Sequence, residues 1–273
     1  MNFVEKLSQA IKTNKSLVCL GLDPDVDLIP RGIGIRDFNR AIIDATSDLV
    51  CAYKPNLAFY EALGSEGYDI LKDTLNHIPC DVPVIGDAKR GDVGSTARLY
   101  AQALFETIGF DAATISPYLG YDCVQWFSSY ADKGVLVLCH TSNPGATDFQ
   151  TVQCLSEDSS VTEPLFALVA RKAKEWNTNG NVGLVAGATY SESLKQIRGI
   201  CPDLVLLIPG VGRQGGDLLS AVSFGTDVGR TKTMFASSRE ILYASDDERF
   251  AESARQATDD LRQRINMMLE QLS

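Results

Sequence analysis

Two carboxylates and one ammonium lie close together in the sequence within residues 82–97: those of Asp87, Asp92 and Lys89. This stretch begins as an apolar run typical of a buried strand and ends in a charged turn at Gly91. Because side chains alternate along a strand, Asp87 and Lys89 are predicted to point to the same face. Desolvating charged groups at a strand end is costly, so three together indicate a function. We take Lys89, held by the two carboxylates, as the candidate catalytic group.

An ammonium held beside carboxylates stays protonated, because a pair about 4 Å apart gains on the order of 4 kcal/mol at an effective dielectric near 20. Such an ammonium is a proton donor and not a nucleophile, because Schiff-base chemistry needs a neutral lysine. A structural salt-bridge cluster is the alternative, but two acids around one lysine leave a surplus negative charge. The carboxylates could also bind Mg²⁺, although the lysine between them competes for the same oxygens.

Eight short apolar runs alternate with segments of helical character along the chain. This alternation predicts a (β/α)8 barrel formed by one domain over residues 1–273, with an open doubly wound sheet as the second choice. No linker or change of composition marks a domain boundary. The expected strands are residues 16–23, 50–56, the run that leads into Asp87, 112–116, 134–139, 182–186, 204–208 and 233–236.

Helices are expected between these strands and at both ends of the chain. Residues 247–272 carry one apolar stripe, which predicts a helix packed on the barrel; a helix that binds a partner is the alternative. The polar stretch 142–161 is expected to be irregular, either a lid over the barrel mouth or a surface loop. The other expected helices are 2–12, 36–48, 58–77, 95–108, 122–131, 163–178 and 191–199.

Composition narrows the class of protein. A formal net charge of −10 and a pI near 4.7 argue against binding to nucleic acid or an anionic membrane, but not against a small phosphorylated ligand. Seven cysteines without a CxxC motif fit reduced thiols in a cytoplasmic protein better than disulfides or a zinc site. Neither a signal peptide nor an apolar run long enough for a membrane span is apparent.

Polar residues follow most of the expected strands. Because active sites of such barrels lie at the carboxyl ends of the strands, these side chains are expected to converge on one mouth. A glycine-rich turn at 209–216 and the helix start at 237–239 are predicted to bind phosphate. Besides Asp87, Lys89 and Asp92, the residues expected at the mouth are Asp23, Lys54, Ser142, Gln214 and Arg239.

The sequence from Asp87 to Asp92, with Thr96 after it, resembles the Asp-x-Lys-x-x-Asp signature of the orotidine 5′-phosphate decarboxylase family. Related sugar-phosphate decarboxylases and synthases share this short motif, so the further matches make the resemblance specific. It covers most of the chain, and the length is similar to that of the larger bacterial form. The further matches are Leu22-Asp23-Pro24, Lys54-Pro55-Asn56, Thr141 to Gly145, Pro209 to Gly216, and Ser238-Arg239.

The resemblance implies a cofactor-free, metal-free loss of CO2 from orotidine 5′-phosphate, which gives UMP in the last step of de novo pyrimidine nucleotide biosynthesis. It assigns Lys89 as the proton donor to C6 of the pyrimidine and places Asp87 beside the departing carboxylate. Lys54 and Asp23 are implied to hold the ribose hydroxyls. In this family the second aspartate crosses a dimer interface, so Asp92 and Thr96 are expected to serve the neighbouring subunit of a homodimer.

The resemblance also implies contacts with the rest of the nucleotide. Ser142 and Gln214 are expected at the pyrimidine, and Gln214 and Arg239 near the phosphate. Pro209, Gly216 and Ser238 belong to the same predicted binding surface. A tyrosine that contacts phosphate in some members is absent, because Gly216 and Asp217 stand at that place. Two alternatives remain open: a Mg²⁺-dependent sugar-phosphate decarboxylase or aldolase, and a phosphate-binding barrel without activity.

Overall fold

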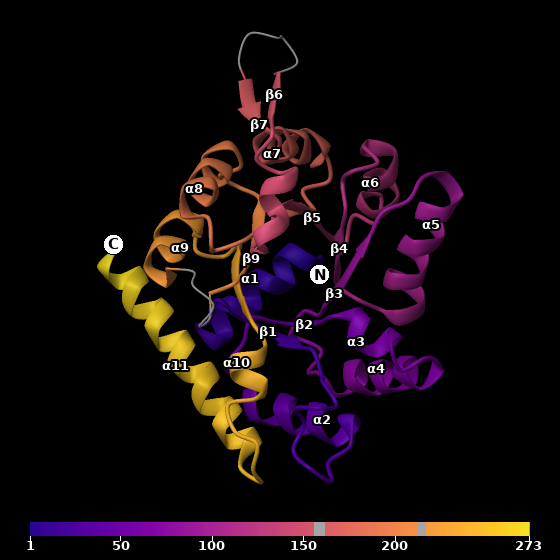
Figure 1. Cartoon of the computed structure of the whole chain (residues 1–273), viewed down its shortest axis with the longest axis vertical. Helices are drawn as coiled ribbons and strands as arrows, with labels where there is room; N and C mark the ends of the chain where they lie inside the picture. The colour runs from indigo at the N-terminus through magenta and orange to yellow at the C-terminus, as the bar shows by residue number, and fades with distance from the viewer. Residues whose placement is uncertain (156–161, 212–216, 273) are drawn as a thin grey trace.

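Eight parallel strands form the centre of the molecule in the computed structural model, which describes residues 1–155, 162–211 and 217–272. Their order is β2-β1-β10-β9-β8-β5-β4-β3, and parallel bridges from Tyr53 to Val84 and from Asn56 to Asp87 close the sheet between β2 and β3. The predicted (β/α)8 barrel is therefore confirmed (Figure 1). The strands are β1 Val18–Leu22, β2 Ala52–Pro55, β3 Ile85–Arg90, β4 Ala112–Ile115, β5 Gly134–His140, β8 Val182–Ala186, β9 Val205–Pro209 and β10 Thr233–Ser237.

The strand β3 differs from the others at its carboxyl end. Residues of β1, β2, β4 and β8 are buried throughout, as near-continuous apolar runs require when both faces are covered. In β3 the pairing with β4 shifts between Gly86 and Arg90, and Lys89 has a φ of 48°. This left-handed conformation is rare for a side-chain-bearing residue and is found most often at functional sites. The charged stretch is thus where the regular sheet stops.

Helices surround the barrel as expected, with one correction. The segment 58–77 forms two helices and not one, because Gly64 has a φ of 65° and turns the chain between them. The helix expected over 95–108 is α5 followed by a π-helical turn. The surrounding elements are α1 Phe3–Asn14, α2 Ile35–Thr46, α3 Leu57–Glu61, α4 Ser65–His77, α5 Gly94–Gln102, η1 Ala103–Ile108, α6 Tyr121–Ser128, α7 Leu165–Trp176, α8 Ser191–Ile200, α9 Leu218–Gly225 and α10 Arg239–Leu242.

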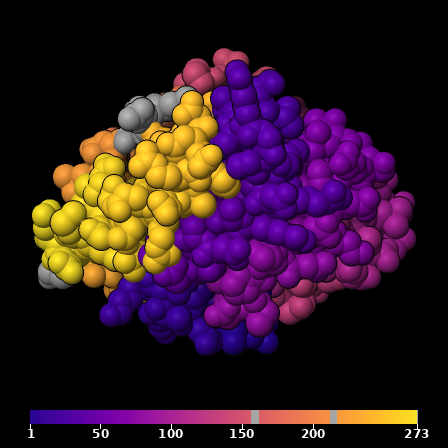
Figure 2. Space-filling model, turned by 90° about the horizontal axis from the view of Figure 1, so that it is seen from below, coloured from indigo at the N-terminus to yellow at the C-terminus, as the bar shows by residue number. Residues whose placement is uncertain are grey.

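The C-terminal helix α11, Phe250–Gln271, packs on the barrel through its apolar stripe. It contacts α2, α9 and α10, and Figure 2 shows the yellow C-terminal segment beside the indigo N-terminal part of the chain. Arg255 pairs with Asp48 after α2 at 2.6 Å. The packed helix is therefore confirmed; Leu269 near its end is buried, whereas Leu272 is 50% exposed.

The stretch 142–161 is more regular than expected. It contains a 3-10 turn, η2 Pro144–Asp148, and the strand β6 Gln153–Leu155, which pairs antiparallel with β7 Thr162–Pro164. The resulting hairpin extends outward from the barrel in Figure 1. Residues 156–161 lie outside the described part of the chain. The choice between a lid and a surface loop stays open.

Candidate active site

The carboxylate of Asp87 is the centre of the charged cluster. Its Oδ2 accepts a hydrogen bond from Nζ of Lys54 at 2.9 Å, and its Oδ1 accepts one from Nζ of Lys89 at 2.7 Å. The side chains of Asp87 and Lys54 are 11% and 9% exposed, whereas that of Lys89 is 49% exposed. The predicted same-face placement of Asp87 and Lys89 is confirmed. The geometry presents one ammonium to the mouth and keeps its partners inside the barrel.

Charge pairing outweighs burial at both inner groups. Burial alone disfavours the carboxylate of Asp87, but the ammonium groups of Lys54 and Lys89 hold the pKa of Asp87 well below its usual range. Burial also disfavours the Lys54 ammonium, but the carboxylates of Asp87 and Asp23 raise the pKa of Lys54 above its ordinary value. The array therefore stays ionised at neutral pH. Alternating charges of this kind form a fixed electrostatic environment that needs little reorganisation during a reaction.

A threonine that no sequence pattern singles out completes the cluster. Thr114, in β4, donates its hydroxyl hydrogen to Oδ1 of Asp87 at 2.8 Å. The same hydroxyl oxygen accepts a hydrogen bond from the backbone N–H of Lys89 at 3.1 Å. Thr114 is only 1% exposed. Threonine is common inside strands, so its residue type does not single it out. Its contact with Asp87 and Lys89 follows only from its position opposite the shifted part of β3.

Asp23 lies at the end of β1 and is held in place by three residues. Its Oδ1 accepts a hydrogen bond from the backbone N–H of Asn56 at 3.2 Å, and its Oδ2 accepts one from the hydroxyl of Ser238 at 2.7 Å. The hydroxyl of Tyr243 donates to the backbone carbonyl of Asp23 at 2.9 Å. Gly21 permits this arrangement, because a Cβ there would lie 2.8 Å from Cβ of Ser238. Tyr243 was not predicted, since only the fold brings it to β1.

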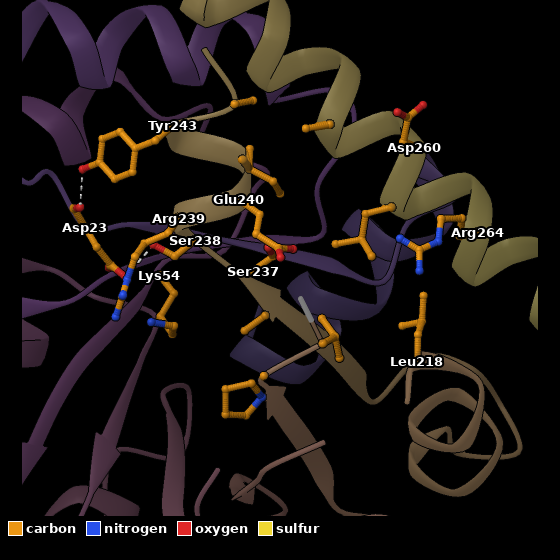
Figure 3. A pocket seen from close by; sticks show the side chains of 18 of the residues that line it. Asp23, Lys54, Leu218, Ser237, Ser238, Arg239, Glu240, Tyr243, Asp260 and Arg264 are labelled. Carbon is orange, nitrogen blue, oxygen red and sulfur yellow. Dashed lines mark hydrogen bonds between the residues drawn. The ribbon is translucent and has the colours of Figure 1, made fainter. Parts of the chain in front are cut away.

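Several of the predicted binding residues share a cavity. Asp23, Lys54, Ser142, Pro209, Ser238 and Arg239 line one cavity of about 960 Å³. Figure 3 shows Arg239 near Asp23 and Lys54, with Asp260 and Arg264 of α11 at the other end. The structure thus brings these six together in one cavity, whereas Asp87 and Lys89 are not among the residues that line it. Gln214 and Gly216, and with them most of the glycine-rich turn, lie outside the described residues.

Asp92 and Thr96 lie outside the hydrogen-bonded cluster around Asp87. The Asp92 carboxylate accepts a hydrogen bond from the backbone N–H of Val93 at 2.8 Å. Lys89 forms an ion pair with Asp87 and none with Asp92. The prediction that both acids hold Lys89 within one chain is therefore wrong for Asp92. Thr96 is exposed at the start of α5. After β3 ends at Arg90 the chain passes through Gly91 into α5, a change of course that the alternation of a straight strand does not predict.

The described residues contain no group of three or more His, Cys, Asp or Glu side chains arranged to hold a metal ion. Both carboxylate oxygens of Asp87 are engaged by Lys54, Lys89 and Thr114, which opposes Mg²⁺ binding there. His140 is buried between the rings of Phe166 and Tyr190. Burial lowers its pKa. No helix in the described part of the chain has the length and apolar character that crossing a membrane requires.

The fold and the site together define a (β/α)8 barrel whose mouth carries a lysine–aspartate–lysine array beside a polar pocket. The family model described as orotidine 5′-phosphate decarboxylase / HUMPS family matches residues 16–254. Orotidine 5′-phosphate decarboxylase of Dehalococcoides mccartyi is 48% identical over 266 residues, which are 97% of this chain and 98% of that protein. The protein of the same name from Thermomicrobium roseum is 49% identical over 279 residues, covering 100% of this chain and 98% of the relative.

The solved structures agree with the sequence relatives. The structure of Leishmania donovani OMP decarboxylase matches with a TM-score of 0.85 and 36% sequence identity, and the match covers 98% of each chain. This chain therefore belongs to the orotidine 5′-phosphate decarboxylase / HUMPS family. The resemblance that rested on the residues around Lys89 is confirmed over the whole barrel.

Proposed function

We propose that this protein decarboxylates orotidine 5′-phosphate to UMP and CO2 without a metal or cofactor. The observation that carries the proposal is the Asp87 carboxylate, which binds two ammonium groups and directs one of them, Lys89, toward the mouth. The names of the full-length relatives support the same reaction. As the reaction that yields UMP, it is the last step of de novo pyrimidine nucleotide biosynthesis. We propose a cytoplasmic enzyme whose single catalytic domain spans residues 1–273, and the seven free cysteines are consistent with a reducing compartment.

The chemistry follows from the charge and position of Lys89. When the bond from C6 to the carboxyl carbon breaks, its electron pair remains on C6 and CO2 leaves. The fixed ammonium of Lys89 stabilises this developing negative charge more than it stabilises the substrate, and it then donates a proton to C6. Asp87 lies beside the departing carboxylate and holds the Lys89 ammonium through a hydrogen bond of 2.7 Å. Lys89 becomes a neutral amine, which solvent reprotonates after UMP forms.

The other mouth residues provide binding and orientation. We assign Lys54 and Asp23 to the ribose hydroxyls, and Ser142, with Gln214, to the pyrimidine. We assign Arg239, with Pro209, Gly216 and Ser238 nearby, to the phosphate end, since a guanidinium can form a bidentate pair with phosphate oxygens. Binding energy at the remote phosphate can orient the ring over Lys89 and drive closure of surrounding loops. The common cavity of the described members supports this division.

We further propose a homodimer in which Asp92 and Thr96 complete the site of the neighbouring subunit. These two residues are turned away from their own Lys89, and exposed apolar side chains surround them in sequence and space. Apolar groups gathered on a surface indicate a protein interface. The exposed apolar side chains lie in or next to α5 and at the start of α6, two helices that pack together. They are Val93, Leu99, Tyr100, Tyr118, Leu119 and Tyr121.

The activity is tested by following the absorbance change when orotidine 5′-phosphate is added to the purified protein in the presence of EDTA. We expect decarboxylation at the same rate with and without the chelator. Loss of activity in EDTA would favour the Mg²⁺-dependent alternative. No decarboxylation by folded, dimeric protein would contradict the proposed function and favour a barrel that only binds phosphate.

The shared site is tested by mixing Lys89→Ala with Asp92→Ala protein and allowing the subunits to exchange. In a mixed dimer one site contains both defects and the other contains neither. With random pairing, about a quarter of the wild-type activity should return, because half of the dimers are mixed and each has one intact site. If both variants are inactive and mixing restores no activity, although mass spectrometry detects mixed dimers, then Asp92 acts in the site of its own subunit.

A further inference from the structure

Thr114 occupies a position in β4 that neither the reaction nor the resemblance assigns. Its hydroxyl makes two hydrogen bonds inside the barrel: it accepts one from the backbone N–H of Lys89 at 3.1 Å and donates one to Oδ1 of Asp87 at 2.8 Å. Oδ1 of Asp87 also receives Nζ of Lys89 at 2.7 Å. One buried hydroxyl therefore joins the backbone of the lysine to the carboxylate that binds its side chain.

The bond to the backbone has a clear cause in the sheet. Between Gly86 and Arg90 the pairing of β3 with β4 shifts, and Lys89 has a φ of 48°. A left-handed residue cannot continue the ladder, so its N–H needs another acceptor inside the barrel. The side chain of Thr114 supplies that acceptor. Without it, the buried N–H would be unpaired, and Lys89 would no longer be held in this one backbone conformation.

We propose that Thr114 is a positioning residue for the decarboxylation: its hydroxyl holds the Lys89 backbone and the Asp87 carboxylate in the one arrangement that directs the Lys89 ammonium into the mouth. The inference rests on the proposed function for the identity of the reaction, but the geometric part stands on the contacts alone. Thr114 touches neither the pocket nor the reacting atoms. It acts through Lys89, and its effect is expected on the rate of the chemical step and not on nucleotide binding.

The test compares Thr114→Val with Thr114→Ser. Valine keeps the shape of the side chain but neither accepts nor donates, whereas serine keeps the hydroxyl. We expect Thr114→Val to lower kcat roughly 10- to 100-fold, since a hydrogen bond to a charged group is lost, with UMP affinity within about 3-fold of wild type. Thr114→Ser should recover most of kcat. Equal loss in both variants would contradict the role of the hydroxyl.

Thr74→Val is the matched control for the loss of a buried hydroxyl. Thr74, in α4, is also 1% exposed, donates to the carbonyl of Ile70 at 2.8 Å and accepts from the side chain of Asn39 at 2.9 Å. Its hydroxyl thus has the same number of bonds but lies outside the site. We expect Thr74→Val to lower the melting temperature as Thr114→Val does and to retain wild-type kcat.

Failure of this inference is distinguishable from failure of the proposed function. If wild type and Thr74→Val decarboxylate the substrate and Thr114→Val matches them in kcat, the positioning role is wrong and the function stands. If wild type has no activity, the function is wrong. In that case a crystal structure of Thr114→Val still decides the geometric part: an unchanged positive φ at Lys89 and an intact contact with Asp87 would overturn it.

Discussion

The two halves of the barrel mouth are built in different ways. On the side of β2, β3 and β4, the side chains of Lys54, Asp87 and Thr114 are on the strands themselves, largely buried and hydrogen-bonded to one another. On the side of β5, β9 and β10, Ser142 and Arg239 follow their strands in the connections. Arg239 is exposed, and its guanidinium has no hydrogen-bond partner in the part of the chain that the structure describes.

This difference separates two requirements of the reaction. Groups that stabilise a short-lived carbanion must be in place before the substrate arrives, and rigid strand ends provide that precision. Groups that bind a phosphate must admit and release the nucleotide, which connecting segments can do by moving. Variants on the strand side should therefore change the rate of the chemical step, and variants on the loop side should change binding.

Lys89→Ala should have the largest effect. Removing the proton donor and the charge beside C6 should lower kcat by about 10⁴-fold or more, while UMP still binds because the loop side is intact. Steady-state kinetics and calorimetric titration with UMP measure the two quantities. Loss of UMP binding together with turnover would mean that the lysine acts in binding and would remove the distinction between the two halves.

Asp87→Asn should destabilise the fold as well as the reaction. It leaves the buried ammonium of Lys54 without its carboxylate, which should lower the free energy of unfolding in urea by about 3 kcal/mol at neutral pH. The control is Asp73→Asn, which breaks an exposed pair with Arg36 whose side chains are 44% and 40% exposed. That loss should stay below about 1 kcal/mol. Equal losses of unfolding free energy in the two variants would show that burial does not preorganise the array of Lys54, Asp87 and Lys89.

Arg239→Ala sharpens the comparison from the loop side. We expect KM for orotidine 5′-phosphate to rise roughly 10- to 100-fold, because a charged contact to phosphate is lost, with a much smaller change in kcat at saturation. Steady-state kinetics over a wide range of substrate concentration separates the two constants. A fall in kcat as large as that of Lys89→Ala would argue that Arg239 belongs to the chemical machinery.

The smallest effect concerns acid stability. Because Lys54 and Lys89 hold the pKa of Asp87 below its unfolded value near 3.8, ionised Asp87 stabilises the folded state above that pH. The stabilisation from ionised Asp87 should decrease as the pH falls below about 4, because the carboxylate becomes protonated. Urea unfolding of wild type and Asp87→Asn from pH 7 to pH 3 should therefore show a difference that narrows in acid. A constant difference would contradict the depressed pKa.

Much of this architecture could be predicted because its causes are local in sequence. Apolar runs specify the strands, and charged residues at their ends locate the mouth. Strand alternation predicted that Asp87 and Lys89 meet, but not the positive φ of Lys89. The bridge through Thr114 and the support from Tyr243 could not be found, because both depend on the register between strands far apart in sequence. The break at Gly64 was missed because glycine inside a helical pattern is often tolerated.

The distinction between the two halves is tested most directly by single-turnover release of CO2 from orotidine 5′-phosphate, with enzyme in excess and saturating, for Lys89→Ala beside Arg239→Ala. Under these conditions weak binding no longer limits the rate. We predict that Arg239→Ala releases CO2 within about tenfold of the wild-type rate and that Lys89→Ala remains about 10⁴-fold slower. Equal rates in the two variants, or a faster Lys89→Ala, would contradict the assignment of the chemistry to the strand-end array.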